Sequence, residues 1–312
     1  MNNVVLGSTN LTVSRLGLGT VEIGIPYGIG DRVLPSDSSA TTLLKTAVDM
    51  GVTYIDTARG YGLAEERIGA SGIAKIDGVV IGTKCAQFLE KGEDVHGAEL
   101  EKRIREDVET SLKNLRLDCL SLVQLHGGSR TQIESGEIIE VMQKLVDEGK
   151  IQHVGIATRG EDAGMAAIES GVFATLQVGY SILDQRMNAK VLPIAKEKNV
   201  GVLNRSVLLQ GVLTKRAEGL PVELSKLKEH ALLAGDIAVQ SGMTLPEMAM
   251  RFSISHPSVC VMLLGTTKIH RLEEALGYLS KGPLTKDVLT ALYDLAIDDE
   301  GQVDPSKWPP RK

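Results

Sequence analysis

The stretch Tyr-Ile-Asp-Thr-Ala-Arg-Gly-Tyr-Gly-Leu-Ala-Glu-Glu-Arg-Ile-Gly runs from Tyr54 to Gly69. Its first residues are typical of a buried strand, its middle of a turn, and its end of a helix. Asp56 closes the apolar run, although a carboxylate at the end of a buried strand is costly unless it has a partner. Tyr61 lies in the turn between two glycines. The stretch therefore predicts one strand–turn–helix unit. It also predicts that Asp56 has a partner elsewhere in the chain.

The same alternation of a short apolar run and a helical stretch recurs along the chain. Nearly continuous apolar runs are typical of parallel strands that are covered on both faces. Eight such units in about 300 residues favour a closed (β/α)8 barrel, a TIM barrel, over an open sheet. The predicted strands are Arg15–Thr20, Thr53–Asp56, Val79–Lys84, Cys119–His126, His153–Thr158, Thr175–Tyr180, Val200–Ser206 and Val259–Gly265.

Two additions to the barrel are expected. Val4–Leu6 and Leu11–Val13 flank a turn and predict an N-terminal β-hairpin that plugs the bottom of the barrel. An extra helix is expected around Leu224–Val239, in the long segment after the seventh strand. No linker or change of composition divides the chain, so we expect one domain over residues 1–312.

The bulk composition limits the class of protein. Apolar residues make up 43% and charged residues 24% of the chain, which is ordinary for a globular protein. A net charge of −6 argues against nucleic acid as a partner. No basic, apolar leader and no apolar run of about 20 residues is evident, so we expect a cytoplasmic protein without membrane association. The three cysteines predict free thiols, we expect no metal site, and the oligomeric state is not indicated.

Four polar residues follow the predicted strands where barrel enzymes carry their active sites. Asp56 ends the second strand and Tyr61 follows it; Lys84 ends the third strand and His126 the fourth. Neighbouring parallel strands lie about 5 Å apart, so these side chains should converge on one rim.

These four residues could act together in a proton transfer. A tyrosine has a pKa near 10 and is a poor proton donor, but the Lys84 ammonium would lower that pKa. Asp56 would keep Lys84 charged, and His126 could hydrogen-bond a substrate oxygen. Tyr61 could then protonate a carbonyl oxygen while hydride reaches the carbon, and hydride requires a cofactor.

The pattern Asp-Thr-Ala-x-x-Tyr-Gly-x-x-Glu from Asp56 to Glu65, with Lys84 and His126 at their strand ends, resembles the aldo-keto reductase superfamily. The resemblance covers nearly the whole chain. It implies a (β/α)8 barrel, Tyr61 as proton donor with the other three residues assisting, and NADP(H) as cofactor.

The expected cofactor loop lies between the eighth strand and its helix, where helix N–H groups suit a phosphate. In the family, basic residues of this loop bind the 2′-phosphate of NADP, so Lys268 and Arg271 favour NADP(H) over NAD(H). Ala275 stands where many relatives have an asparagine. The candidate cofactor residues are Thr20, Thr158, Gln177, Arg205, Ser206, Gln210, Gly211, Leu213, Gly265, Thr266, Thr267, Lys268, Arg271 and Glu274.

The nicotinamide end departs from the family pattern. Ala157-Thr158 replaces the Ser-Asn of many relatives, and Arg205 precedes Ser206 where relatives often stack a tyrosine. A guanidinium plane can also stack on a ring. Alternatively, Arg205 is a salt-bridged structural residue.

The candidate substrate residues suggest an open, polar pocket suited to hydroxylated or sugar-like carbonyl compounds. They are Glu22, Tyr27, Arg59, Phe88, Tyr180 and Trp308. The sequence predicts NADPH-dependent reduction of an aldehyde or ketone. It also leaves open an NAD(P)-dependent aldose dehydrogenase, a cofactor-binding regulatory protein with little turnover, and a Schiff-base aldolase using Lys84.

Overall fold

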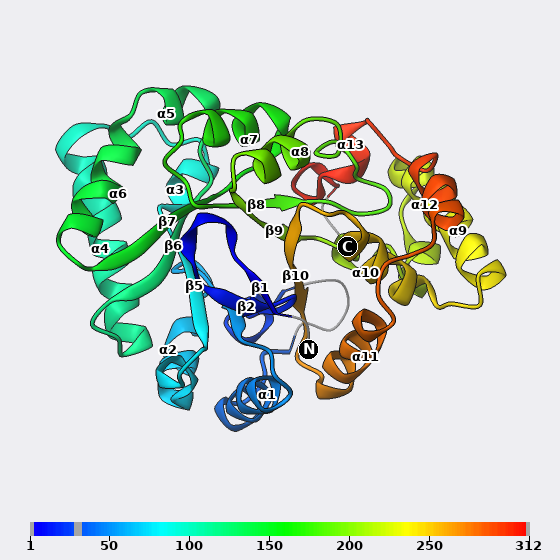
Figure 1. The fold of residues 1–312 in the computed structure, drawn as a ribbon, viewed down its shortest axis with the longest axis horizontal. Coiled ribbons are helices and arrows are strands. Elements are labelled where there is room, and N and C mark those ends of the chain that lie inside the picture. The colour runs from blue at the N-terminus through cyan, green and yellow to red at the C-terminus, as the bar shows by residue number, and fades with distance from the viewer. Residues whose placement is uncertain (1–2, 28–32, 310–312) are drawn as a thin grey trace.

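The computed structural model describes residues 3–27 and 33–309. Eight parallel strands close into a barrel in the order β10-β3-β4-β5-β6-β7-β8-β9, with helices around it (Figure 1). All eight lie at the predicted places, which confirms the (β/α)8 fold. They are β3 (Leu16–Gly19), β4 (Tyr54–Asp56), β5 (Val80–Cys85), β6 (Leu120–His126), β7 (Ile151–Ala157), β8 (Thr175–Gly179), β9 (Gly201–Arg205) and β10 (Val259–Gly265).

The helices bury one apolar face against the strands, and their buried residues form the main core. In chain order they are α1 (Asp37–Asp49), α2 (Ala64–Ser71), α3 (Gln87–Glu90), α4 (Gly97–Leu115), α5 (Arg130–Glu134), α6 (Glu137–Asp147), α7 (Gly160–Glu169), α8 (Val191–Glu197), α9 (Ser225–Gln240), α10 (Leu245–Ser255), α11 (Ile269–Ser280), α12 (Lys286–Tyr293) and α13 (Glu300–Val303). The extra helix expected after the seventh barrel strand is α9. None of the helices within residues 3–27 and 33–309 is long and apolar enough to cross a membrane.

The N-terminal hairpin closes the bottom of the barrel, as predicted. Its strands β1 (Asn3–Val5) and β2 (Thr12–Ser14) pair antiparallel. Leu6 and Val13 are fully buried in a second apolar cluster with barrel residues such as Leu122 and Val261. This cluster fills the lower half of the barrel and leaves the carboxyl ends of the strands for polar side chains.

The segment after β9 has an unusual backbone. Ser206, Leu209 and Gln210 all have positive φ, at 61°, 44° and 53°, a conformation that costs energy for residues other than glycine. The side-chain amide of Gln210 donates to the Tyr27 hydroxyl at 3.3 Å, so this loop contacts the loop after β3. Both loops therefore meet beside the mouth of the barrel.

Candidate active site

Asp56 has the partner that the sequence predicted. The Lys84 Nζ lies 2.7 Å from Asp56 Oδ2 and also donates to the Thr57 carbonyl at 2.9 Å. Asp56 pairs with Gly82 in the β4–β5 register, so Lys84 lies two residues further along its strand and both side chains reach the barrel axis. Because both side chains are almost fully buried, each charge depends on the other.

Tyr61 lies against this pair. The Lys84 ammonium is 5.1 Å from the centre of the Tyr61 ring, and the His126 ring meets it edge-on at 5.8 Å. Burial raises the pKa of Tyr61 and outweighs Lys84, which lowers it. Lys84 thus acts on this pKa in the expected direction, but burial has the larger effect. The phenol keeps its proton, which is the form that a proton donor needs.

His126 is neutral in this environment. Burial, and next the charge of Lys84, lower the pKa of His126 to about 3, although Glu90 opposes the shift. Its Nε2 lies 3.5 Å from Glu90 Oε2. A neutral imidazole carries one N–H donor, so His126 can donate a single hydrogen bond toward the mouth.

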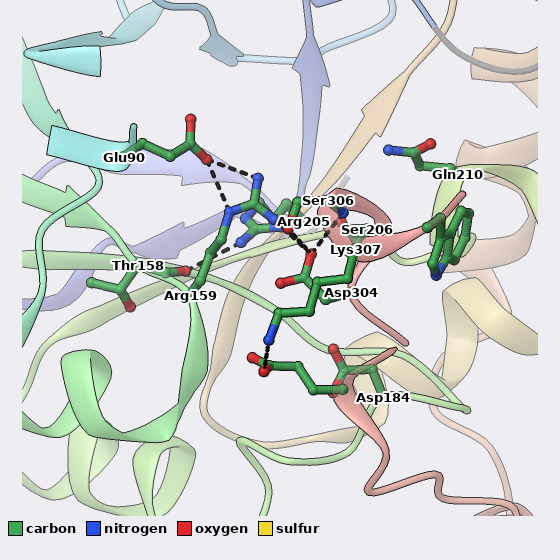
Figure 2. Close-up of polar contacts among 12 residues, drawn as sticks. Glu90, Thr158, Arg159, Asp184, Arg205, Ser206, Gln210, Asp304, Ser306 and Lys307 are labelled. Atoms are coloured by element: carbon green, nitrogen blue, oxygen red, sulfur yellow. Dashed lines mark hydrogen bonds and ion pairs between the residues drawn. The ribbon is translucent and has the colours of Figure 1, made fainter. Parts of the chain in front are cut away.

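A charged network that sequence reasoning missed borders the same mouth (Figure 2). The Arg159 Nε and Nη2 donate to Glu90 Oε1 at 3.0 and 2.8 Å, and its Nη1 donates to Asp304 Oδ1 at 2.9 Å. Glu90 follows β5 and Arg159 follows β7, so the rule that found Lys84 also points to these two loops. Asp304 lies in the C-terminal segment, where no motif marked it.

Comparison with known proteins fits this geometry. A family model described as "Aldo/keto reductase family" matches residues 15–297. The chain belongs to the aldo/keto reductase family. The holo form of aldo-keto reductase AKR11C1 from Bacillus halodurans superposes with a TM-score of 0.79 at 25% identity, covering 97% of this chain and 99% of that one.

Two curated relatives extend the comparison. NADH-specific methylglyoxal reductase from Escherichia coli is 34% identical over 69% of each chain. L-galactose dehydrogenase from Arabidopsis thaliana is 28% identical over 95% of this chain and 90% of its own length. This aldo/keto reductase is thus an oxidoreductase for small-molecule carbonyl compounds that works with a nicotinamide cofactor.

The residues of the reductase fit the nicotinamide end of such a cofactor. Arg205 reaches across the mouth to donate to the Thr158 carbonyl at 3.2 Å and to Ser206 Oγ at 3.3 Å. The Thr158 hydroxyl is buried and has no hydrogen-bond partner among the described residues. A buried, unpaired hydroxyl is costly, so it is suited to a ligand amide.

Two other residues expected at this end are engaged by Asp56. The Gln177 amide donates to Asp56 Oδ1 at 2.7 Å, and the Thr20 hydroxyl donates to the Asp56 carbonyl at 2.9 Å. Both are buried. They fix Asp56 in place, and the carbonyl oxygen of the Gln177 side chain is the atom left for a cofactor amide.

The loop expected to bind the cofactor phosphate borders an open groove between α1 and α11. Its lining includes Ser38, Ser39 and Thr42 of α1, which sequence reasoning missed, and Thr267, Lys268 and His270. Thr266 Oγ1 accepts from the backbone N–H of Lys268 at 3.0 Å, and no side chain caps the N-terminus of α11. Lys268, Arg271 and Glu274 are exposed, and Ala275 is fully buried. The free helix N–H groups and basic side chains suit a phosphate.

Glu22, expected beside a substrate, lies next to Gly265 at the end of β10. A methyl group at the Gly265 Cα would lie 3.6 Å from Glu22 Oε1. Burial raises the pKa of Glu22, and the nearby Arg216 opposes the shift. Gly211, expected to contact the pyrophosphate, lies beside Arg216 as well, while Leu213 is fully buried and has only its backbone to offer.

Three of the expected substrate walls are largely buried. Arg103 of α4 covers the Phe88 ring at 3.9 Å, and Phe88 is 6% exposed. Tyr180 stacks on Phe252 in the core. Trp308 is 8% exposed and donates to the Gln302 carbonyl at 2.8 Å.

Arg59 and Tyr27 occupy the rim. Arg59 Nη1 lies 3.3 Å from Glu65 Oε2. Glu65 is a buried carboxylate that also accepts from the Thr83 hydroxyl at 2.6 Å, so Arg59 serves first as its counter-charge. Tyr27 is 44% exposed and, of the expected walls, is the aromatic side chain most open to solvent.

Proposed function

We propose that the protein is an NADPH-dependent reductase of aldehydes or ketones in which Tyr61 donates the proton. The observation that carries the proposal is the buried Asp56–Lys84 pair under the Tyr61 ring, with neutral His126 at its edge. One point of the mouth is then surrounded by three groups. Tyr61 is the acid, Lys84 is the cation that stabilises its conjugate base, and His126 is a second hydrogen-bond donor.

The chemistry divides between the cofactor and the chain. A bound reduced nicotinamide supplies the hydride. Tyr61 gives its proton to the substrate oxygen, and the Lys84 ammonium stabilises the phenolate that remains. His126 Nε2–H donates to the same oxygen, and Asp56 holds Lys84 in place.

The test is Tyr61→Phe, which removes only the hydroxyl. We expect NADPH-dependent reduction of a simple aldehyde, followed by loss of absorbance at about 340 nm, to fall by about 10²–10⁴-fold. NADPH binding, followed by nucleotide fluorescence, should stay at the wild-type level because the ring remains. Wild-type turnover in this variant would show that another group donates the proton.

A sugar dehydrogenase running in the oxidative direction is the second candidate. One full-length relative is named L-galactose dehydrogenase, and the mouth of this chain is rich in charged hydrogen-bonding groups. The same four catalytic residues would serve both directions. Assays with NADP⁺ or NAD⁺ against aldoses, beside the reductive assay, separate the two.

An aldolase and a regulatory protein fit the site less well. Burial lowers the pKa of Lys84, but Asp56 and Tyr61 outweigh it and the pKa is raised. A lysine held as an ammonium is a poor Schiff-base nucleophile, which argues against an aldolase. The complete set of four residues argues against a regulatory protein without turnover.

A further inference from the structure

Glu90 is a carboxylate beside the predicted reaction point that the proposed mechanism does not use. It is the last residue of α3, just after β5, and its side chain is 25% exposed. One oxygen, Oε2, lies 3.5 Å from His126 Nε2. The other, Oε1, accepts two hydrogen bonds from Arg159, which Asp304 holds from the opposite side (Figure 2).

This arrangement anchors Glu90 at one oxygen. Both donors of the Arg159 guanidinium converge on Oε1, so the ion pair uses that atom and leaves Oε2, the oxygen near His126, outside it. Arg159 is itself tied to the C-terminal segment, and Asp304 is buried and also accepts from the Ser306 backbone at 2.9 Å. Glu90 Oε2 is therefore held toward His126.

We propose that Glu90 is a specificity and positioning residue that favours carbonyl substrates with a hydroxyl on the neighbouring carbon. The inference rests on the proposed function, which places the substrate oxygen within about 3 Å of His126 Nε2. Glu90 Oε2 then faces that oxygen, and neither atom is a donor. A hydroxyl on the next carbon supplies the missing donor to Glu90, whereas a methyl group there leaves two acceptors opposed.

The same carboxylate orients His126. The Nδ1 atom of His126 is buried without a hydrogen-bond partner among the described residues, whereas Nε2 faces Glu90. An ionised carboxylate accepts only, so it favours the tautomer with its proton on Nε2. The contact with Glu90 is long, at 3.5 Å, so a bound substrate oxygen can take over this single N–H.

The experiment compares 2-hydroxypropanal with 2-methylpropanal, which differ by a hydroxyl in place of a methyl, at equal concentrations of free aldehyde. We expect wild type to prefer the hydroxy aldehyde in kcat/KM by about tenfold or more, the range of a hydrogen bond to a charged group. In Glu90→Gln the amide oxygen stays on the Arg159 donors, which turns the NH₂ toward His126. This NH₂ can donate to the carbonyl oxygen of either aldehyde, so the opposition of two acceptors is gone and the preference should fall to about twofold or less.

Glu93→Gln is the matched control. Glu93 pairs with Arg103 on the outside of the barrel at 2.9 Å and should leave the preference unchanged. Should Glu90→Gln fail to bind NADPH, Arg159→Lys, which loosens Glu90 but keeps its charge, should lower the preference by an intermediate factor.

The outcomes separate the two proposals. Equal efficiency of wild type on both aldehydes, or a preference that survives in Glu90→Gln or, where that variant fails, in Arg159→Lys, overturns the role of Glu90 and leaves the reductase proposal standing. If wild type reduces neither aldehyde with NADPH or NADH, the reductase proposal fails and this inference fails with it.

Discussion

At the scale of single residues, burial sets the direction of the pKa shift at Tyr61 and at His126. The sequence correctly paired Asp56 with Lys84, because adjacent strand ends must meet. It also gave the direction in which Lys84 acts on the pKa of Tyr61, but not the larger, opposite effect of burial, because the depth of the ring is a property of the folded chain. His126 shows the same effect, since burial lowers its pKa to about 3.

This lowered pKa predicts a pH-dependent stability. The unfolded chain takes up a proton on His126 near pH 6.5 and the folded chain only near pH 3, so the free energy of unfolding falls as pH drops through that window. Between pH 7 and pH 4.5 we expect His126 to contribute a loss of about 2 kcal/mol. Urea unfolding of wild type and His126→Gln at both pH values measures it.

The comparison within each protein removes the other titrating groups. Carboxylates titrate in both proteins, so the difference between the two pH-dependent losses isolates His126. Identical losses in wild type and His126→Gln would mean that the pKa of His126 is the same in the folded and unfolded chains, which contradicts a lowered pKa.

At the scale of elements, the start of α11 is the feature that we propose to set cofactor choice. Its N-terminus carries no side-chain cap, and Lys268 and Arg271 lie exposed beside it. The serines of α1 that face this loop were beyond sequence reasoning, because α1 and α11 are far apart in the chain. One relative is named as NADH-specific, so the choice between NADPH and NADH has to be measured.

Replacing both basic residues tests the assignment of NADP(H). Lys268→Ala with Arg271→Ala should weaken NADPH binding by about tenfold or more and leave NADH nearly unchanged, because only NADPH carries a 2′-phosphate. Fluorescence titration with each nucleotide measures both constants. Lys286→Ala, an exposed lysine at the start of α12, is the control. Equal weakening of both nucleotides would exclude a 2′-phosphate site here.

Features that depend on neighbouring residues could be predicted from the sequence, whereas contacts between residues far apart in the chain could not. All strands, the hairpin and α9 could be predicted because each depends on local periodicity. The Glu90–Arg159–Asp304 network could not, because Asp304 lies 145 residues after Arg159 and only the closed barrel brings them together. The contact of Arg103 with the Phe88 ring could not be predicted either, since it joins α4 to the segment after β5.

At the scale of the whole molecule, the hairpin closes the bottom of the barrel. Its apolar cluster fills the lower interior of the barrel. Gly7, in the connection between β1 and β2, packs closely against Gly201, the first residue of β9. Chain ends that are tied down in this way contribute to global stability rather than fraying. The polar mouth thus lies above a packed apolar cluster to which Leu6 and Val13 of the hairpin contribute.

Gly7→Ala tests how tightly the hairpin packs against β9. Gly7 has a φ of +55°, and a methyl group on it would lie 2.2 Å from the Gly201 backbone nitrogen, a clash that no side-chain rotation can relieve. Gly78 has a φ of +82° with nothing within 4 Å of such a methyl group, so Gly78→Ala carries the backbone cost alone, about 1 kcal/mol. We expect Gly7→Ala to lower the free energy of unfolding by about 1–3 kcal/mol more than Gly78→Ala in urea titrations. Equal losses would mean that the hairpin can move away from β9 and does not seal the barrel.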